Sequence, residues 1–446
     1  MTTNSTQPAR GTRDFLPADV RRRTYVIDVV RSVYERYGFE PLETPAFENI
    51  ETLLGKYGDE GNQLIFKILK RGEHEASGAA DLALRYDLTV PLARVVAQYQ
   101  NELPRYFKRY QIQPVWRADR PARGRFREFY QCDVDAVGST SPIVEVEVIS
   151  AVTDVLTTLG FDDFAIRLNH RRLLSALLEG AGIPAEKHND ALVSIDKLDK
   201  IGNDGVVADL GGRGIDGAAA GRLLASFAMR GPEALASLGL TVSGHESGAA
   251  AVRELEAIVQ LAAATPAGPR LQIDPSLARG LSYYTGAIME IAVSDLPGSL
   301  GGGGRYDDLV GMFLGRELPA CGFSLGLERI IVVMTERGMF PASIAAGTVD
   351  IVVTCMDDDS RAEALRFASE LRAGAMRVDV FPEASRKFDK PLKYASARGA
   401  RVMGIFGENE RTRGEVSIRN LNTREQQTVP RDRAAEVVSQ MLNRGT

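Results

Sequence analysis

The side chains best suited to chemistry in this sequence lie in four short segments. In residues 84–91, LRYDLTVP, Asp87 and Thr89 follow a strand-like stretch. An acid and a hydroxyl two residues apart at the end of a strand can bind an ammonium group. The same pair is also typical of the start of a helix, where side-chain oxygens accept backbone N–H groups. Ligand binding and helix capping therefore both stay open for this segment.

The second segment combines an arginine-rich loop with a polar strand. The loop starts at Arg117, and residues 125–135, RFREFYQCDVD, continue as a strand. Alternation along a strand places Arg127, Gln131 and Asp135 on one face. Arg, Gln and Asp make a poor core surface, so this face indicates a wet, polar ligand site. The planar guanidinium groups of the loop match the geometry of phosphate oxygens.

The third segment, residues 277–286 with the sequence LARGLSYYTG, contains Arg279 and two adjacent tyrosines. On a strand, Tyr283 and Tyr284 must face opposite sides, so one can belong to the core and the other to a site. Strand propensity and packing are a sufficient explanation for either tyrosine taken alone.

The fourth segment contains four consecutive glycines in residues 299–307, SLGGGGRYD, and then residues 321–329, CGFSLGLER. The glycines permit a close backbone approach, although by themselves they more often indicate a flexible loop. No Gly-Lys-Ser/Thr follows, so this is not a phosphate-binding P-loop. The second piece reads as a strand that leads into a helix carrying Arg329. An arginine early in a helix is usually only solvated.

Composition sets the frame for these segments. With 446 residues the chain predicts two or three domains, and 44% hydrophobic and 25% charged residues are typical of a soluble globular protein. The net charge of −5 does not exclude a nucleic-acid partner, because phosphates are bound by local patches. Residues 105–127 contain eight Arg or Lys and one acid, interrupted by aromatic residues and prolines.

Cysteine and histidine usage gives little sign of a disulfide framework or a structural metal. The three cysteines are far apart, and the four histidines have no metal-ligand spacing, so we expect no structural zinc. No apolar run reaches membrane-spanning length and no signal peptide is evident. We therefore expect a cytoplasmic protein without a membrane partner.

The elements that must position these segments fall into blocks. Residues 20–38 predict an amphipathic helix, and strand-like stretches with basic loops continue to about residue 138. This pattern of strands and loops predicts an antiparallel sheet with flanking helices. Residues 170–265 are rich in Ala and Leu and predict an inserted helical domain. After this domain, strand-like stretches and glycine-rich segments appear again.

After a Gly/Pro/Ala/Ser-rich segment at about 338–348, strands and helices alternate from residue 349 onward. This alternation predicts a compact C-terminal α/β domain with a mainly parallel sheet. The fold class is thus α+β. The expected domains are a catalytic domain in two parts, a helical insertion and an α/β domain, at 1–169, 266–340, 170–265 and 346–446 respectively.

Taken together, the four segments resemble the class II aminoacyl-tRNA synthetases, and among them the histidyl-tRNA synthetase family. Residues 20–45 resemble motif 1, which forms a homodimer, residues 117–135 resemble motif 2, and residues 322–329 resemble motif 3. Residues 279–284 resemble the histidine signature. The amino-acid sequences of several segments, including SIDKLDKI at 194–201, most resemble the eukaryotic-type branch of the family. The C-terminal domain resembles an anticodon-binding domain.

The resemblance implies a histidine–tRNA ligase that joins L-histidine to ATP, which enters with Mg²⁺, and then transfers the histidyl group to tRNA(His). It implies that Arg117 and Arg279 are catalytic and stabilise charge at the α-phosphate. The implied ATP-binding residues are Arg117, Asp119, Arg125 and Arg329. The implied histidine-binding residues are Asp87, Thr89, Arg117, Gln131, Asp135, Arg279, Tyr283 and Tyr284.

Within that set, Asp87 and Thr89 would bind the α-ammonium group, and Gln131 would contact the amino-acid backbone. Asp135 and the two tyrosines would line the imidazole pocket. A buried acid and a phenol can satisfy both ring nitrogens, so an editing domain is not required. Ser282 departs from the family signature, which commonly has Asp there.

Several rival interpretations remain open at this stage. The main one is a catalytically silent, synthetase-like regulatory subunit, although such proteins typically lack the C-terminal domain and degrade the histidine signature. Another class IIa synthetase would share the three motifs but not residues 279–284. A class I synthetase is disfavoured because neither HIGH nor KMSKS occurs. A non-catalytic tRNA-binding module would leave the arginines unexplained.

Overall fold

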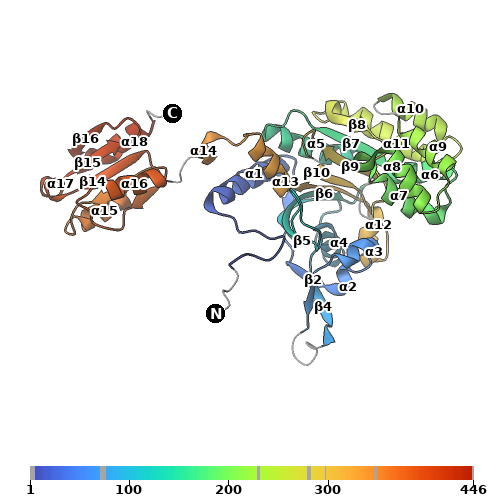
Figure 1. The fold of residues 1–446 in the computed structure, drawn as a ribbon, viewed down its shortest axis with the longest axis horizontal. Coiled ribbons are helices and arrows are strands. Elements are labelled where there is room, and N and C mark those ends of the chain that lie inside the picture. The colour runs from blue at the N-terminus through green and yellow to red at the C-terminus, as the bar shows by residue number, and fades with distance from the viewer. Residues whose placement is uncertain are drawn as a thin grey trace. The chain divides into compact units, whose positions relative to one another are not determined.

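A computed structural model describes residues 6–70, 77–228, 232–278, 283–296, 298–345 and 349–443 (Figure 1). The chain divides into two compact units, Met1–Met339 and Phe340–Thr446. Each unit has its own buried apolar core. The two units are therefore described separately.

The first unit opens with a long helix, α1 (Pro17–Arg36), which has proline in its first turn. Proline is suited to this place because its missing N–H would have no partner there. Val26, Val30, Val33 and Tyr34 form the buried stripe of the helix. The chain turns after α1 at Gly38, whose φ is +74°. The helix expected over 20–38 is thus confirmed, with a start three residues earlier.

The described strands of the first unit build one large sheet in the order β1-β5-β6-β11-β10-β9-β7-β8. The edge pairs β1/β5 and β7/β8 are parallel, and the pairings between them are antiparallel. The expected antiparallel sheet is therefore confirmed. Its strands are β1 (Glu40–Pro41), β5 (Phe107–Trp116), β6 (Glu128–Val137), β7 (Ala165–His170), β8 (Leu271–Ile273), β9 (Ala287–Ala292), β10 (Ser299–Arg305) and β11 (Ala320–Gly326).

Helices and a small second sheet surround the large one. Helices α1, α5 and α13 pack on β6 and β11, while α4 packs against α12. The small sheet has the order β2-β4-β3. These elements are β2 (Phe47–Asn49), β3 (Lys67–Leu69), β4 (Ala80–Leu84), α2 (Ile50–Leu53), α3 (Gly58–Gln63), α4 (Thr89–Gln98), α5 (Ile143–Thr158), α12 (Asp307–Leu314) and α13 (Leu327–Glu336).

A block of helices lies between β7 and β8, in the green part of Figure 1. Because β7 and β8 are parallel neighbours, with Ile166 opposite Leu271, the chain leaves the sheet and re-enters it at the same edge. The bounds 170–265 of a separate helical domain stay a prediction. The helices are α6 (Arg171–Gly180), α7 (His188–Ile195), α8 (Leu198–Gly212), α9 (Gly217–Phe227), α10 (Pro232–Thr241) and α11 (Glu246–Ala262).

The second unit is a five-stranded sheet with helices, within the residues described, in the order β13-β12-β14-β15-β16. The apolar clusters of the unit include Ile351, Phe367 and Phe406 in one and Val352 and Met403 in the other. Its elements are α14 (Ala342–Ala345), β12 (Ile351–Cys355), α15 (Arg361–Ala373), β13 (Val378–Val380), α16 (Asp389–Ala397), β14 (Val402–Phe406), α17 (Glu408–Arg413), β15 (Glu415–Asn420), β16 (Gln426–Pro430) and α18 (Ala434–Asn443).

The expectation of a mainly parallel sheet in this unit was wrong for its second half. Strand β12 pairs in parallel with β13 and β14, but β14/β15 and β15/β16 are antiparallel. The cause is the length of the connections, 407–414 and 421–425. A parallel crossover needs a dozen or more residues, so these short connections can join only antiparallel neighbours.

Candidate active site

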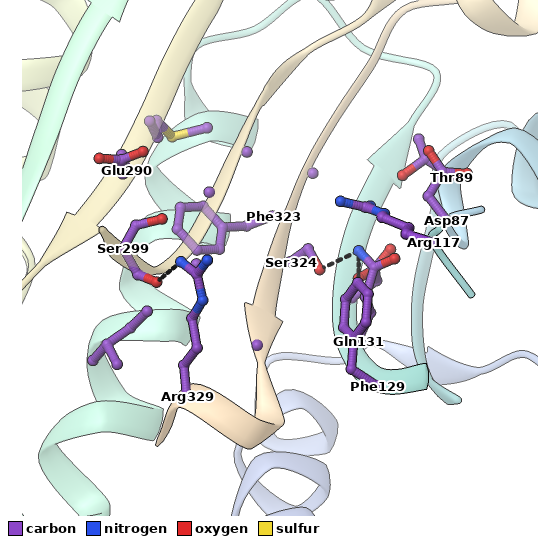
Figure 2. A pocket seen from close by; sticks show the side chains of 18 of the residues that line it. Asp87, Thr89, Arg117, Phe129, Gln131, Glu290, Ser299, Phe323, Ser324 and Arg329 are labelled. Carbon is purple, nitrogen blue, oxygen red and sulfur yellow. Dashed lines mark hydrogen bonds between the residues drawn. The ribbon is translucent and has the colours of Figure 1, made fainter. Parts of the chain in front are cut away.

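A cavity of about 300 Å³ lies over the centre of the large sheet (Figure 2). Residues from β6, β9, β10, β11 and the start of α4 line it. The cavity brings together every residue of the expected site that the structure describes. Those residues are Asp87, Thr89, Arg117, Asp119, Arg125, Gln131, Asp135, Tyr283, Tyr284 and Arg329.

The alternation expected for strand β6 is present. Gln131, Asp133 and Asp135 line the cavity, while Cys132 and Val134 are buried in the core. Gln131 Nε2 donates a hydrogen bond of 2.6 Å to Ser324 Oγ on the neighbouring strand β11 (Figure 2). This bond orients the amide, and its Oε1 has no hydrogen-bond partner among the described residues. The oxygen is thus available to a ligand N–H.

Asp87 accepts a hydrogen bond from the first turn of helix α4 and also lines the cavity. Helix capping and ligand binding, the two interpretations of this segment, are therefore compatible. Asp87 Oδ1 accepts from the Val90 N–H at 3.1 Å and from the Tyr57 hydroxyl at 2.9 Å. Its Oδ2 accepts from the Tyr283 hydroxyl at 3.1 Å. Burial raises the pKa of the Asp87 carboxyl, while these hydrogen bonds favour its charged form. A cationic ligand group would relieve that burial cost.

Arg117 is held beside Asp87 by the backbone. Its Nε donates to Tyr86 O at 3.0 Å, and its guanidinium carbon lies 4.3 Å from the centre of the Tyr86 ring. The same guanidinium carbon lies 5.2 Å from the centre of the Phe129 ring. The guanidinium thus contacts two aromatic rings and is held at the cavity wall, where it can meet an anionic group.

Arg125 and Asp119 form a two-point ion pair with each other. Arg125 Nη2 lies 2.8 Å from Asp119 Oδ1, and Nε lies 3.1 Å from Oδ2. The resemblance implies that Arg125 binds phosphate and that Asp119 lies near the adenine. For these separate roles the ion pair must open, or the two side chains must bind ATP while still paired. On the side of the cavity away from Asp87 and Thr89, Arg329 Nη1 donates to Ser299 O at 2.5 Å (Figure 2).

The expectation that Tyr283 and Tyr284 face opposite sides of a strand was wrong. Both tyrosines line the cavity, and their ring centres are 5.1 Å apart. Side-chain alternation holds only within a strand, and β9 begins later, at Ala287. Arg279 and Ser282 of the same signature lie outside the described residues, so their expected positions stay predictions.

The run of glycines at 301–304 is not a flexible loop but the strand β10, where it forms part of the cavity floor. A Cβ on Gly303 would lie 2.1 Å from Gly322 O, and one on Gly301 would lie 2.4 Å from Ser324 O. The neighbouring strand therefore leaves no room for side chains here. The bare backbone also leaves space above the sheet for a ligand.

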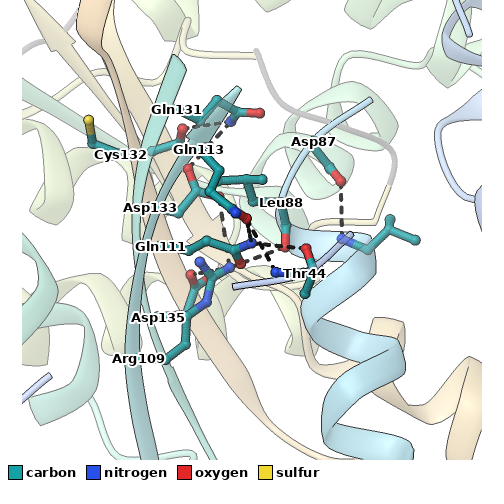
Figure 3. Close-up of polar contacts among 12 residues, drawn as sticks. Thr44, Asp87, Leu88, Arg109, Gln111, Gln113, Gln131, Cys132, Asp133 and Asp135 are labelled. Carbon is teal, nitrogen blue, oxygen red and sulfur yellow. Dashed lines mark hydrogen bonds and ion pairs between the residues drawn. The ribbon is translucent and has the colours of Figure 1, made fainter. Parts of the chain in front are cut away.

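Sequence reasoning did not single out three buried polar residues around Asp135. The Tyr306 hydroxyl donates a short hydrogen bond to Asp135 Oδ1, and Arg109 Nη2 lies 2.9 Å from Asp135 Oδ2 (Figure 3). Asp133, two residues before Asp135, shares the same cation at 3.8 Å. The alternation of β6 could have indicated Asp133, whereas no local pattern marks Arg109 or Tyr306.

The described residues contain no group of three or more His, Cys, Asp and Glu side chains arranged to hold a metal ion. Across the same ranges, no helix has both the length and the apolar character needed to span a bilayer.

The large antiparallel sheet, the arginine-lined cavity above it and a separate α/β unit define a class II aminoacyl-tRNA synthetase. A family model described as Histidyl-tRNA synthetase matches residues 11–330, and one described as Anticodon binding domain matches residues 350–441. The chain belongs to the histidyl-tRNA synthetase family.

Curated relatives agree over nearly the whole length. The chain is 41% identical to a histidine–tRNA ligase of Gloeobacter violaceus, over 97% of this chain and 98% of the relative. It is also 41% identical to a histidine–tRNA ligase of Porphyromonas gingivalis, over 96% and 98%. The crystal structure of histidyl-tRNA synthetase from Nostoc sp. PCC 7120 has a TM-score of 0.80 at 31% identity, covering 98% of this chain and 99% of that chain.

Proposed function

We propose that this chain is an ATP-dependent histidine–tRNA ligase. It joins L-histidine to ATP to give histidyl-adenylate and pyrophosphate, and it transfers the histidyl group to the 3′ end of tRNA(His). The observation that supports this most is a single cavity with buried carboxyls at Asp87 and Asp135 and guanidinium groups at Arg117 and Arg329. Such a cavity suits an amino acid and a polyphosphate bound side by side.

The amino acid would bind at the end formed by Asp87 and Thr89. Asp87, oriented by the hydroxyls of Tyr57 and Tyr283, would receive the α-ammonium group. Gln131 Oε1 would accept a hydrogen bond from the ligand. Asp135 and Tyr284 would contact the imidazole, whose two nitrogens need partners in a buried pocket. Tyr283 would act on the ammonium end because its hydroxyl donates to Asp87.

ATP would lie toward Arg329, and Mg²⁺ would enter as its counterion. The histidine carboxylate attacks the α-phosphorus, and the bond to the pyrophosphate leaving group breaks. Negative charge then increases on the α-phosphoryl oxygens, so fixed cations there lower the barrier. We assign that role to Arg117 and Arg279. Arg125, released from Asp119, and Arg329 would hold the outer phosphates.

The second unit would bind the anticodon arm of tRNA(His), since residues 350–441 match a model described as an anticodon binding domain. We further propose a homodimer formed through the motif 1 segment, a cytoplasmic location and membership of the eukaryotic-type branch. The domain bounds 1–169, 170–265, 266–340 and 346–446 belong to the same proposal.

The rival function is a catalytically silent regulatory subunit. Such a protein has no need for oriented phosphate ligands, yet Arg117 is held at the cavity wall by a hydrogen bond to Tyr86 O and by contacts with two aromatic rings. The test is aminoacylation by the purified chain with labelled L-histidine, ATP and total tRNA. Acid-stable label on tRNA(His) is expected, and a catalytically silent subunit would leave the tRNA unlabelled.

A first prediction concerns Gly322, which lies opposite Asp135 on strand β11. A Cβ at Gly322 would lie 1.8 Å from Asp135 Oδ1, so alanine must displace this carboxylate. We expect Gly322→Ala to raise the KM for histidine in pyrophosphate exchange about tenfold or more, with the KM for ATP little changed. Gly221→Ala, within helix α9, is a control at a glycine without a positive φ whose added Cβ meets no atom within 4 Å. An unchanged KM for histidine in Gly322→Ala would remove Asp135 from the imidazole pocket.

A further inference from the structure

Beneath the cavity, two strands present a matched row of polar side chains. In the antiparallel pair β5/β6, Arg109 is opposite Asp135 and Gln111 is opposite Asp133. These side chains project to the same side of the two strands, as Figure 3 shows. All four residues are buried, and Arg109 is 0% exposed. A buried row of this kind must balance its own charges, because water cannot screen them.

Arg109 is the cation of this row. Its Nη2 lies 2.9 Å from Asp135 Oδ2 and 3.8 Å from Asp133 Oδ2, and it donates to Leu88 O at 3.3 Å. Arg109 Nε and Nη1 have no hydrogen-bond partner within the described part of the chain. Arg109 is therefore placed for charge compensation more than for a full set of hydrogen bonds. Through Leu88 it also touches the segment that presents Asp87.

Two carboxylates thus share one guanidinium. With both ionised, the Arg109–Asp133–Asp135 triad carries a net charge of −1 at the inner wall of the cavity. Gln111, the other polar neighbour, adds no charge and is engaged elsewhere, since its Nε2 donates to Thr44 Oγ1 at 2.9 Å and to Gln113 Oε1 at 2.6 Å. Because Asp133 and Asp135 both line the cavity, the excess negative charge faces the cavity.

We propose that Arg109 and Asp133 are positioning residues for imidazole recognition. Arg109 holds Asp135 ionised and oriented, and Asp133 supplies the additional negative charge that favours a side chain with N–H donors and partial positive charge. This inference rests on the proposed function. It adds two residues, Arg109 on β5 and Asp133 on β6. Neither needs to contact the ligand, but both influence the charge at Asp135, which does.

The charges around the triad determine the expected pH dependence. Burial raises the pKa of both Asp133 and Asp135, and Arg109 opposes that rise in each, while the neighbouring Asp135 carboxylate further raises the pKa of Asp133, to about 7. The other titratable or charged groups that interact with this triad are Tyr34, Arg85, Asp87, Cys132, Tyr284, Tyr306 and Cys321. The negative charge that Asp133 adds is therefore lost as pH falls through its pKa of about 7.

The sign of the pH effect follows directly. Histidine recognition needs ionised Asp135 and is lost as pH falls through its pKa. In the unaltered protein, recognition is weakened earlier, as pH falls through the Asp133 pKa of about 7; Asp133→Asn lacks this titration, so its acid limb of kcat/KM for histidine lies at lower pH by about half a unit or more. The substrate imidazole titrates identically in both proteins, so the difference between the two profiles belongs to the protein.

The experiment measures pyrophosphate exchange with L-histidine and ATP for the full-length protein and four variants. The variants are Arg109→Met, Arg109→Lys, Asp133→Asn and the double variant Arg109→Met/Asp133→Asn. We expect the KM for histidine to rise about 30-fold or more in Arg109→Met and about tenfold in Asp133→Asn, with the KM for ATP within about twofold. Lysine at 109 should recover part of the loss.

The double variant best distinguishes an effect of charge from an effect of packing. It restores a net charge of −1, so its KM for histidine should lie below that of Arg109→Met alone, which a loss of packing would not produce. Asp350→Asn is a matched control, because Asp350 is also paired with an arginine, Arg377 at 2.7 Å, but lies in the other unit. It should leave both KM values unchanged.

The outcomes separate this inference from the proposed function. If the unaltered protein shows no histidine-dependent exchange, the proposed function itself fails. If that protein is active while Asp133→Asn keeps both its KM for histidine and its acid limb, the inference is overturned. The same holds if histidine and ATP KM values rise equally. Should Arg109→Met fail to fold, the near-isosteric Asp133→Asn profile decides the question.

Discussion

Replacing Arg117 with alanine should lower histidine-dependent pyrophosphate exchange by about 10²–10³-fold. The guanidinium is fixed by Tyr86 O at 3.0 Å and by two aromatic rings, so it is already oriented before the substrates arrive. A cation held in this way stabilises the charge that builds on the α-phosphoryl oxygens without a reorganisation cost. The loss should fall on kcat more than on either KM, because the interaction strengthens in the transition state.

Arg105→Ala is the matched control for this prediction. Arg105 is exposed two residues before strand β5, outside the cavity, so its removal should leave exchange within about twofold. Circular dichroism and a thermal melt of Arg117→Ala establish that the variant is folded. A folded Arg117→Ala protein with undiminished kcat would contradict the catalytic role assigned to this arginine.

Deleting the second unit, residues 340–446, should separate the two half-reactions. The cavity belongs wholly to the first unit, so adenylate formation should persist. Charging of tRNA(His) should lose about a hundredfold or more in kcat/KM, because two tethered binding modules reinforce each other and one of them is gone. Parallel measurements of exchange and aminoacylation on the same truncated protein give the comparison.

The second unit has its own apolar core, which includes Ile351, Phe367, Phe406 and Val438, and so its removal does not cut through the first core. A melt of the truncated protein compared with the whole chain checks this point. If the truncated protein charges tRNA(His) as well as the whole chain, the second unit is not the tRNA-binding module proposed here.

Much of the site could be predicted from the sequence because it depends on local periodicity. The two-residue repeat of β6 was sufficient to bring Gln131 and Asp135 to one face, and Asp87 was recognisable at the junction of a strand and a helix. The long helix α1 carries the period of an amphipathic helix over five turns. In segments of this kind, the directions of the side chains follow from the pattern of neighbouring residues.

What could not be predicted depends on contacts between distant segments. Arg109 and Tyr306 reach Asp135 from a different strand and from the end of β10, 171 residues away in the case of Tyr306. The pairing of Arg125 with Asp119 depends on how the intervening loop folds back. Tyr283 and Tyr284 share the cavity because the strand starts only after them, and the exact start of a strand is weakly encoded.

The most direct test of the central proposal is pyrophosphate exchange by the purified protein with each of the twenty amino acids in turn. This reaction reports adenylate formation without tRNA, and it identifies the amino acid that the cavity accepts. We predict ATP-dependent exchange with L-histidine that exceeds exchange with every other amino acid by about 10⁴-fold, given a pocket built to hydrogen-bond the imidazole. Exchange with a different amino acid, or with none, would contradict the account.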